Sequence, residues 1–295
     1  MDVLGKILVP IDVNTDNSEQ ISSAIQLAKA YKSGIILMSV IPDLDLKDEI
    51  KGIVEKSVTS SLNDIKKTFT ENDIEVHETI VAFGNIVETI INKVNSSDIN
   101  LVLISENIKN KRAKFKLSGK SEQIIRASDV PVYLVCQTKK KFLNHILCPV
   151  DFSEPSRRAL YNAISLARKF NATLTILNVF EPLDYISSRI TVDLEEENTL
   201  RLQRAHDDTK DFIGEFDLEE VDHKIEIKSG KAFENILDMI KKQDIDFLIM
   251  GTNGRTGLSS YIMGNITEKV IREMPCSFIT VKKINAIGVS TVTYA

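Results

Sequence analysis

An internal repeat constrains this chain more than any other feature of its sequence. The segment KILVPID at 6–12 returns 139 positions later as HILCPVD at 145–151, with proline and aspartate in the same places. In each copy, apolar residues at helical spacing follow, and a second apolar run comes after them. This order predicts a strand–helix–strand unit, which builds a parallel sheet with right-handed crossovers. We therefore expect two copies of one α/β fold.

The later parts of the two copies match at a different offset. Gly84 corresponds to Gly230, which is an offset of 146. The second copy therefore has seven more residues between its second and third strands, the difference between the two offsets. We place them in 183–216, whose later part predicts a long polar helix. The three glutamates at 195–197 are expected to face solvent rather than a metal, because adjacent helical residues splay apart.

The domain limits follow from the repeat. We expect a first domain, a linker, a second domain and a tail at 1–138, 139–144, 145–283 and 284–295. So short a linker predicts two domains in contact. The tail is either an added strand or disordered. In the first domain, a helix is expected to begin at Ser18 and to be closed by Gly34, before a strand at 35–41.

A glycine-rich loop follows the second-last apolar run of the chain. The run at 247–250 ends at Gly251, and Gly254 and Gly264 follow before a stretch with helical spacing. Glycine admits positive φ and close approach to the backbone, so such a loop can turn its N–H groups toward an anion. A helix that follows adds about half a positive elementary charge at its N-terminus. These properties point to a phosphate-binding loop, although the glycine spacing alone fits a plain flexible loop equally well.

The spacing G-x2-G-x9-G of these glycines resembles the signature of the nucleotide-binding branch of the universal stress protein family. In that signature Ser or Thr follows the last glycine, whereas Asn265 follows here; its amide can still donate to a phosphate oxygen. With the order of elements and the P-x-D ending of the first strand, the resemblance covers nearly the whole chain. It implies two tandem copies of a doubly wound five-stranded parallel sheet with helices on both faces, an adenine-nucleotide α-hydrolase-like or Rossmann-like fold.

The resemblance also implies a nucleotide pocket in the second copy, at the carboxyl ends of the strands. The adenine, ribose and phosphate groups would contact Pro149, Val150, Asp151, Val179, Met250, Gly251, Gly254, Gly264, Asn265 and Ile266. Capping of the next helix is an equally favoured role for Asp151, and Ser153 is the other candidate for that cap. Arg255 and Thr267 could reach phosphates, although exposure or local capping is favoured for both. No residue is assigned to catalysis or to a metal.

The same site is expected to be lost in the first copy. At the offset of 146, the three glycines and Asn265 fall on Ser105, Ile108, Ser118 and Gly119. Ile108 is β-branched and resists the left-handed conformation that such loops often need. The run Gly119-Lys120-Ser121 resembles the end of a Walker A loop, but Lys114 stands where that motif needs glycine. We therefore expect one strong nucleotide site per chain, in the C-terminal domain.

Six basic residues with no acid among them form a local positive patch in the loop that replaces the glycine loop in the first copy, at Lys109, Lys111, Arg112, Lys114, Lys116 and Lys120. A solvated loop is the favoured interpretation, and a surface for an anionic ligand or partner is the alternative.

The composition argues against several functions. The chain is 43% hydrophobic and 27% charged, which is typical of a water-soluble globular protein. A net charge of -5 argues against non-specific binding to nucleic acid. No apolar run approaches the roughly 20 residues that a membrane span needs. The N-terminus also lacks the basic-then-apolar pattern of an export signal. We therefore expect a cytoplasmic protein.

Catalytic machinery is not visible in the sequence. The histidines are scattered, at His77, His145, His206 and His223, and no nucleophile stands next to a base. The cysteines are odd in number and form no C-x-x-C pair, so we expect buried free thiols at Cys136, Cys148 and Cys276.

The resemblance therefore implies a stress-response protein that binds ATP, with or without Mg²⁺, and acts by associating with client proteins. A nucleotide-free scaffold of the same fold is one alternative, and slow Mg²⁺-dependent ATP hydrolysis near Asp151 is another. Family members pair through their last strands, here 130–135 and 276–281. A tandem chain can satisfy that pairing internally as a pseudo-dimer, and dimerisation of whole chains stays open.

Overall fold

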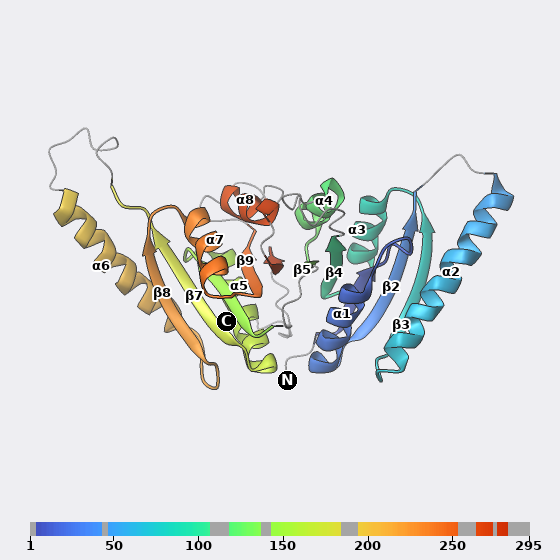
Figure 1. Cartoon of the computed structure of the whole chain (residues 1–295), viewed down its shortest axis with the longest axis horizontal. Coiled ribbons are helices and arrows are strands. Elements are labelled where there is room, and N and C mark those ends of the chain that lie inside the picture. Colours follow the sequence, from blue (N-terminus) through green and yellow to red (C-terminus); the bar gives the residue numbers. More distant parts are fainter. Residues whose placement is uncertain are drawn as a thin grey trace.

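The computed structural model describes residues 4–42, 47–106, 118–136, 143–183, 194–252, 264–273 and 276–282. Strands and helices alternate through both halves of the chain (Figure 1). The first half contains β1 (Lys6–Pro10), α1 (Ser18–Tyr31), β2 (Gly34–Ile41), α2 (Asp48–Thr70), β3 (Val76–Phe83), α3 (Ile86–Ser96), β4 (Leu101–Glu106), α4 (Gly119–Ala127) and β5 (Val132–Cys136). The second half contains β6 (His145–Val150), α5 (Glu154–Phe170), β7 (Thr173–Phe180), α6 (Leu194–Ile213), β8 (His223–Ser229), α7 (Ala232–Lys242), β9 (Phe247–Gly251), α8 (Asn265–Glu273) and β10 (Ser277–Val281).

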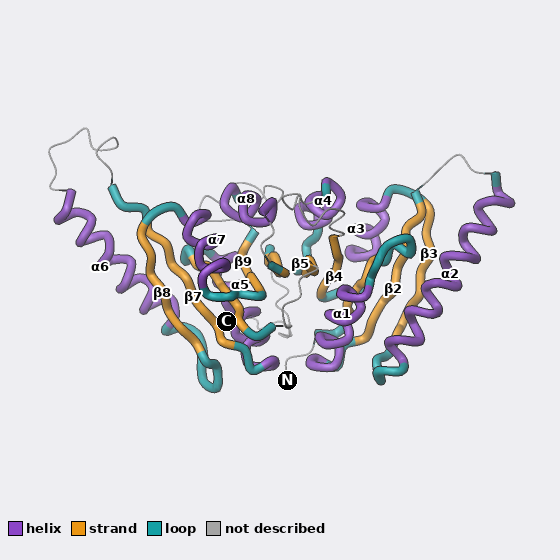
Figure 2. The backbone as a smooth tube through the Cα atoms, in the orientation of Figure 1, coloured by secondary structure: helices purple, strands orange, loops and turns teal. Residues whose placement is uncertain are grey.

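The strands form one sheet in the order β3-β2-β1-β4-β5-β10-β9-β6-β7-β8 (Figure 2). All neighbouring strands within a half are parallel. The two halves meet where β5 and β10 pair antiparallel, with Val132 opposite Thr280 and Leu134 opposite Phe278. The predicted fold of two doubly wound five-stranded parallel sheets is confirmed. The expected pairing of the last strands occurs within the chain and joins the two sheets.

The sheet is buried on both faces, as parallel sheets are. Along β1, Ile7 and Val9 belong to the core on one face, and Leu8 belongs to the core on the other. Helices α1, α2, α5 and α6 supply the first core, and α3, α4, α7 and α8 supply the second. Helices α2 and α6 lie at the two outer ends of the molecule, whereas α4 and α8 meet above its middle (Figure 1).

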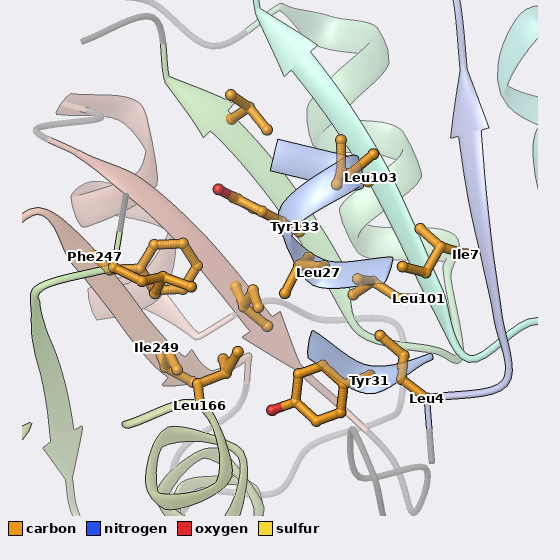
Figure 3. Close-up of a cluster of buried hydrophobic side chains, with 14 of the residues drawn as sticks. Leu4, Ile7, Leu27, Tyr31, Leu101, Leu103, Tyr133, Leu166, Phe247 and Ile249 are labelled. Carbon is orange, nitrogen blue, oxygen red and sulfur yellow. The ribbon is translucent and has the colours of Figure 1, made fainter. Parts of the chain in front are cut away.

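The two halves share a continuous core at the junction. Figure 3 shows Tyr31 of α1 near Leu166 of α5, and Tyr133 of β5 near Phe247 of β9. The Tyr133 and Phe247 rings are 5.1 Å apart in an edge-to-face arrangement. The Tyr31 hydroxyl lies 3.0 Å from the Ser165 hydroxyl, and both groups are buried. The two halves are therefore in direct contact, as the short linker predicts.

Gly34 does not close α1, so that prediction was wrong. The helix ends at Tyr31, and Lys32 takes the left-handed conformation with φ of 54° and donates its N–H to the Ala28 carbonyl. Gly34 is the first residue of β2, where a Cβ atom would clash with the His77 ring. Glycine is therefore needed for close packing rather than for the turn. The matched residue in the second copy, Asn171, also ends its helix in the left-handed conformation.

The three cysteines are free and buried, as predicted. Burial raises the pKa of the Cys136 thiol to about 11 and raises the pKa of the Cys148 thiol further. Neither thiol is therefore a nucleophile near neutral pH. None of the helices in the described ranges combines the length and the apolar character needed to cross a membrane.

Candidate functional site

A cavity of about 590 Å³ lies at the carboxyl ends of β6, β7 and β9. Its volume falls in the range of roughly 300–1,000 Å³ that is usual for small-molecule sites. Nine of the ten predicted site residues line it, namely Pro149, Val150, Asp151, Val179, Met250, Gly251, Gly264, Asn265 and Ile266. The tenth, Gly254, lies outside the described residues, as does Arg255. The structure thus brings together residues that are more than 100 positions apart in the chain.

Asp151 follows β6 and organises the start of α5. Its Oδ1 accepts hydrogen bonds from the Ser153 N–H at 3.1 Å and from the Ser153 hydroxyl at 2.5 Å. Ser153 is the N-cap of α5, and its Oγ accepts from the Ser156 N–H. Of the two candidate caps, Ser153 therefore makes the capping bond. Asp151 holds the cap in place and lines the cavity.

Gly251 ends β9 directly against the first turn of α5. A Cβ atom at this position would lie 2.8 Å from both the carbonyl carbon and the Cβ of Pro155. Real Cβ atoms do not approach other atoms so closely, so only glycine fits without a shift of the backbone. The glycine therefore lets the strand end and the helix start share one wall of the cavity.

The N-terminus of α8 faces the cavity next to Gly251. The Gly264 N–H donates to the Thr252 carbonyl at 2.6 Å, and the Thr267 hydroxyl donates to the Gly251 carbonyl at 2.8 Å. These bonds fix the first turn of α8 to the end of β9, which gives Thr267 a local role. The N–H groups of Asn265, Ile266 and Thr267 donate to no acceptor among the described residues. They are available to an anion, together with the positive end of the helix dipole.

Several residues that line the cavity were not predicted from the sequence. They are Phe152, Ser156, Leu177, Asn178, Phe180, Glu181, Arg201, Ala205, Asp208, Ala232, Ile236 and Thr267, the last of which was predicted only as an alternative. Asn178 is 4% exposed, and its Nδ2 donates to the Val150 carbonyl at 3.0 Å. A single asparagine inside the apolar run TLTILNVF was the signal for it.

Helix α6 closes the outer side of the cavity with Arg201, Ala205 and Asp208. The Arg201 guanidinium pairs with Glu197 at 3.2 Å and donates to the Glu181 carbonyl. These residues carry no sequence signal, because only the fold brings α6 to the end of β7. No group of three or more acidic, histidine or cysteine side chains in the described part of the chain could hold a metal ion.

The first copy has no comparable anion site in its described residues. Ser105 replaces Gly251 and donates its hydroxyl to Gln20 Oε1 at 2.9 Å. Ser118 replaces Gly264 and caps α4 by accepting from the Ser121 N–H. Ile108 and the basic residues at 109–116 lie outside the described residues, and the remaining one, Lys120, is exposed. A separate cavity nevertheless remains at this end of the first copy.

The fold and the two cavities define a tandem doubly wound α/β protein with ligand cavities at the switch points of its sheet. The sequence profile of the universal stress protein family matches residues 4–135 and 143–282. The chain therefore belongs to the universal stress protein family, as a tandem two-domain member.

Similar proteins cover the same two domains. The universal stress protein E homolog of Haemophilus influenzae is 25% identical, over 94% of this chain and 96% of that protein. A protein of unknown function from Pseudomonas aeruginosa has a similar structure, with a TM-score of 0.72, 22% identity and coverage of 96% of this chain and 94% of the other. A universal stress protein from Archaeoglobus fulgidus gives a TM-score of 0.67 and 22% identity, over 94% and 98% of the two chains.

Proposed function

We propose that the protein binds ATP in the C-terminal cavity and acts through nucleotide-dependent association with other proteins. The N-terminus of α8 carries this proposal. Three N–H groups of its first turn, at Asn265, Ile266 and Thr267, have no acceptor in the described structure and lie at the cavity. Such an arrangement binds phosphate oxygens, because the N–H groups and the helix dipole both favour negative charge.

Part of the cavity wall suits an adenine ring. Apolar side chains of Leu177, Val179 and Ile236 line the cavity, and they offer contact area to a planar heterocycle. The Asp151 carboxylate also lines it and can accept a hydrogen bond from a ribose hydroxyl. The lining thus offers apolar surface for a base, a carboxylate for a sugar and a helix N-terminus for phosphates.

Fast catalysis has no support in this site. The described lining residues include no histidine and no cysteine. Asp151 Oδ1 accepts two hydrogen bonds from Ser153, which gives this carboxylate a structural role at the cap of α5. We therefore propose a binding protein rather than an ATPase.

Calorimetric titration with ATP, in the presence and absence of Mg²⁺, tests the proposal on three proteins. The wild type is expected to bind one ATP per chain. Asn265→Asp places a carboxylate beside the phosphates and is expected to weaken binding about tenfold. An acidic residue in the first turn stabilises a helix, so the loss will not come from unfolding. Gly119→Asp makes the matched change in α4 and is expected to leave ATP affinity unchanged.

Two outcomes would contradict the proposal. Absence of binding heat with ATP, ADP and AMP, together with no nucleotide released from the purified protein on heating, would favour the nucleotide-free scaffold. Phosphate release that Asn265→Asp abolishes would favour the slow ATPase.

A further inference from the structure

The cavity of the N-terminal domain has a volume of about 1370 Å³, larger than that of the C-terminal cavity. It lies at the carboxyl ends of β1, β2 and β4, and α2, α3 and α4 complete its walls. We propose that this cavity binds an uncharged, mainly apolar small molecule with one hydrogen-bonding group. The proposal concerns a different site from the one above, and it does not depend on nucleotide binding.

Smaller side chains at matched positions widen the floor of this cavity. At the offset of 139, Phe152 and Phe180 of the C-terminal cavity become Val13 and Ile41. Both changes remove an aromatic ring and leave an aliphatic surface. The space released is not filled by other described side chains, because the cavity there is the larger of the two. A bulkier apolar ligand than an adenine ring therefore fits.

The change from Asn178 to Ser39, also at the offset of 139, leaves a polar group at this floor. Ser39 is 4% exposed and lines the cavity. Its hydroxyl forms no hydrogen bond with any residue that the structure describes, whereas the Asn178 amide is bonded to Val150. The Ser39 hydroxyl is therefore open to the cavity and can donate to or accept from a ligand group, which is why the proposed ligand carries one hydrogen-bonding group.

The outer wall of the cavity is mainly apolar. Helix α2 contributes Ile53, Val54 and Val58 together with Ser57, where α6 contributes Arg201, Ala205 and Asp208 to the other cavity. Ile53 stands at the rim and is 68% exposed, which is unusual for so large an apolar side chain. An apolar ligand would cover part of it.

Oxygens of the chain occupy part of the end of the cavity that would receive a phosphate. Glu106 stands where the second copy has Thr252, and its Oε1 accepts from the Ser118 N–H at 3.1 Å. Ser118 Oγ caps α4 by accepting from the Ser121 N–H at 3.2 Å, whereas the matched Thr267 N–H of α8 has no acceptor among the described residues. Lys120 is the one basic residue among the described residues of the lining, against the acidic Asp12 and Glu106. An anion at this helix end would displace a cap and face a carboxylate.

Fluorescence titration with the neutral apolar dye N-phenyl-1-naphthylamine tests the proposal on the whole chain. The wild type is expected to bind it saturably, and saturating ATP is expected to leave it bound. Ile53→Gln removes apolar contact at the rim and is expected to weaken binding about threefold to tenfold. Ile50→Gln is the matched control, because Ile50 lies on the same helix and is 45% exposed but does not line the cavity.

A second variant, Val13→Phe/Ile41→Phe, installs the aromatic residues of the C-terminal cavity and is expected to weaken dye binding at least about tenfold. Three results would overturn the proposal: no saturable binding by the wild type, equal weakening by Ile50→Gln and Ile53→Gln, or displacement of the dye by ATP. Circular dichroism of each variant checks that it is folded. The double variant has a second readout, since a folded variant that still binds the dye as tightly as the wild type also refutes the assignment.

Discussion

The carboxyl ends of the strands in the two copies keep the same strand order and differ in the turns and side chains that follow the strands. Pro10 and Asp12 of the first copy match Pro149 and Asp151 of the second, and both pairs line a cavity. The differences lie at the start of the last helix of each copy. In the second copy three N–H groups of that helix are open, whereas in the first copy Ser118 accepts from one of the three matched groups, the Ser121 N–H, and the Glu106 carboxylate lies beside them. The strands and helices therefore determine that a cavity exists, and the capping residues determine which ligand it accepts.

A ring of charged side chains joins the two helices that begin at these cavities. Arg126 of α4 pairs with Glu122 at 2.8 Å and with Glu268 of α8 at 2.9 Å. Arg272 of α8 pairs with Glu268 at 2.7 Å and lies 3.8 Å from Glu122. The two arginines occupy matched positions, at the offset of 146. The copies have thus kept a symmetric contact at the junction, although their cavities have diverged.

Replacement of Gly251 at the end of β9 is expected to reduce stability more than the other substitutions. Gly251→Ser places the residue of the first copy against Pro155, where a Cβ atom has no room. We expect a loss of about 1–3 kcal/mol in the free energy of unfolding, measured by urea denaturation, and weaker ATP binding. The reciprocal change Ser105→Gly removes one hydrogen bond to Gln20 and is expected to cost about 1 kcal/mol. If Gly251→Ser were as stable as the wild type, the close approach of β9 to α5 would be wrong.

The two matched arginines of the charged ring are expected to contribute unequally to the free energy of unfolding. Arg126→Ala removes a side chain that is 30% exposed and bonded to two glutamates, and it is expected to cost about 1 kcal/mol. Arg272→Ala removes a side chain that is 57% exposed, and it is expected to cost roughly 0.5 kcal/mol or less. Urea denaturation at low and high salt measures both values. Equal losses of unfolding free energy in the two variants would show that the difference in exposure between Arg126 and Arg272 does not affect their contributions to stability.

A pH effect is expected in the C-terminal half alone. Burial lowers the pKa of His145 from its ordinary value, and Asp246 and Asp222 offset this only in part. The unfolded chain therefore binds a proton more readily than the folded one, so stability decreases as the pH falls through about 6.5 and below. The first copy has Lys6 in place of a histidine at the matched position.

The variant His145→Gln is expected to flatten the dependence of the urea midpoint on pH between about 7.5 and 5.5. His206→Gln, at an exposed position on α6, is the control and is expected to leave the slope as in the wild type. An unchanged slope in His145→Gln would mean that another group causes the acid sensitivity.

The sequence predicted the fold because each half is locally consistent. The repeat of KILVPID as HILCPVD, the apolar strands and the polar helix in the later part of 183–216 together imply the order of elements, and the structure confirms it. The family resemblance implied the ten site residues, and nine of them line one cavity. Gly34 was misassigned because a glycine after a helix has two explanations, a turn or close packing, and only the position of His77 distinguishes them.

Features that depend on distant contacts could not be predicted. Arg201 and Asp208 reach the cavity only because α6 packs beside β7, and no spacing in the sequence encodes that contact. Glu106 was also missed, since a carboxylate after a strand has no assigned partner until Ser118 is placed next to it. The greater width of the N-terminal cavity fits the smaller side chains of Val13 and Ile41, whose positions match Phe152 and Phe180 but become informative only once a cavity is seen there.

A crystal structure of the whole chain grown with millimolar ATP tests most directly the claim that the two cavities have diverged. We expect one nucleotide per chain, in the C-terminal cavity, with phosphate oxygens within hydrogen-bonding distance of the N–H groups of Asn265 and Ile266. Nucleotide in the N-terminal cavity, or a C-terminal cavity that stays without nucleotide, would contradict the account.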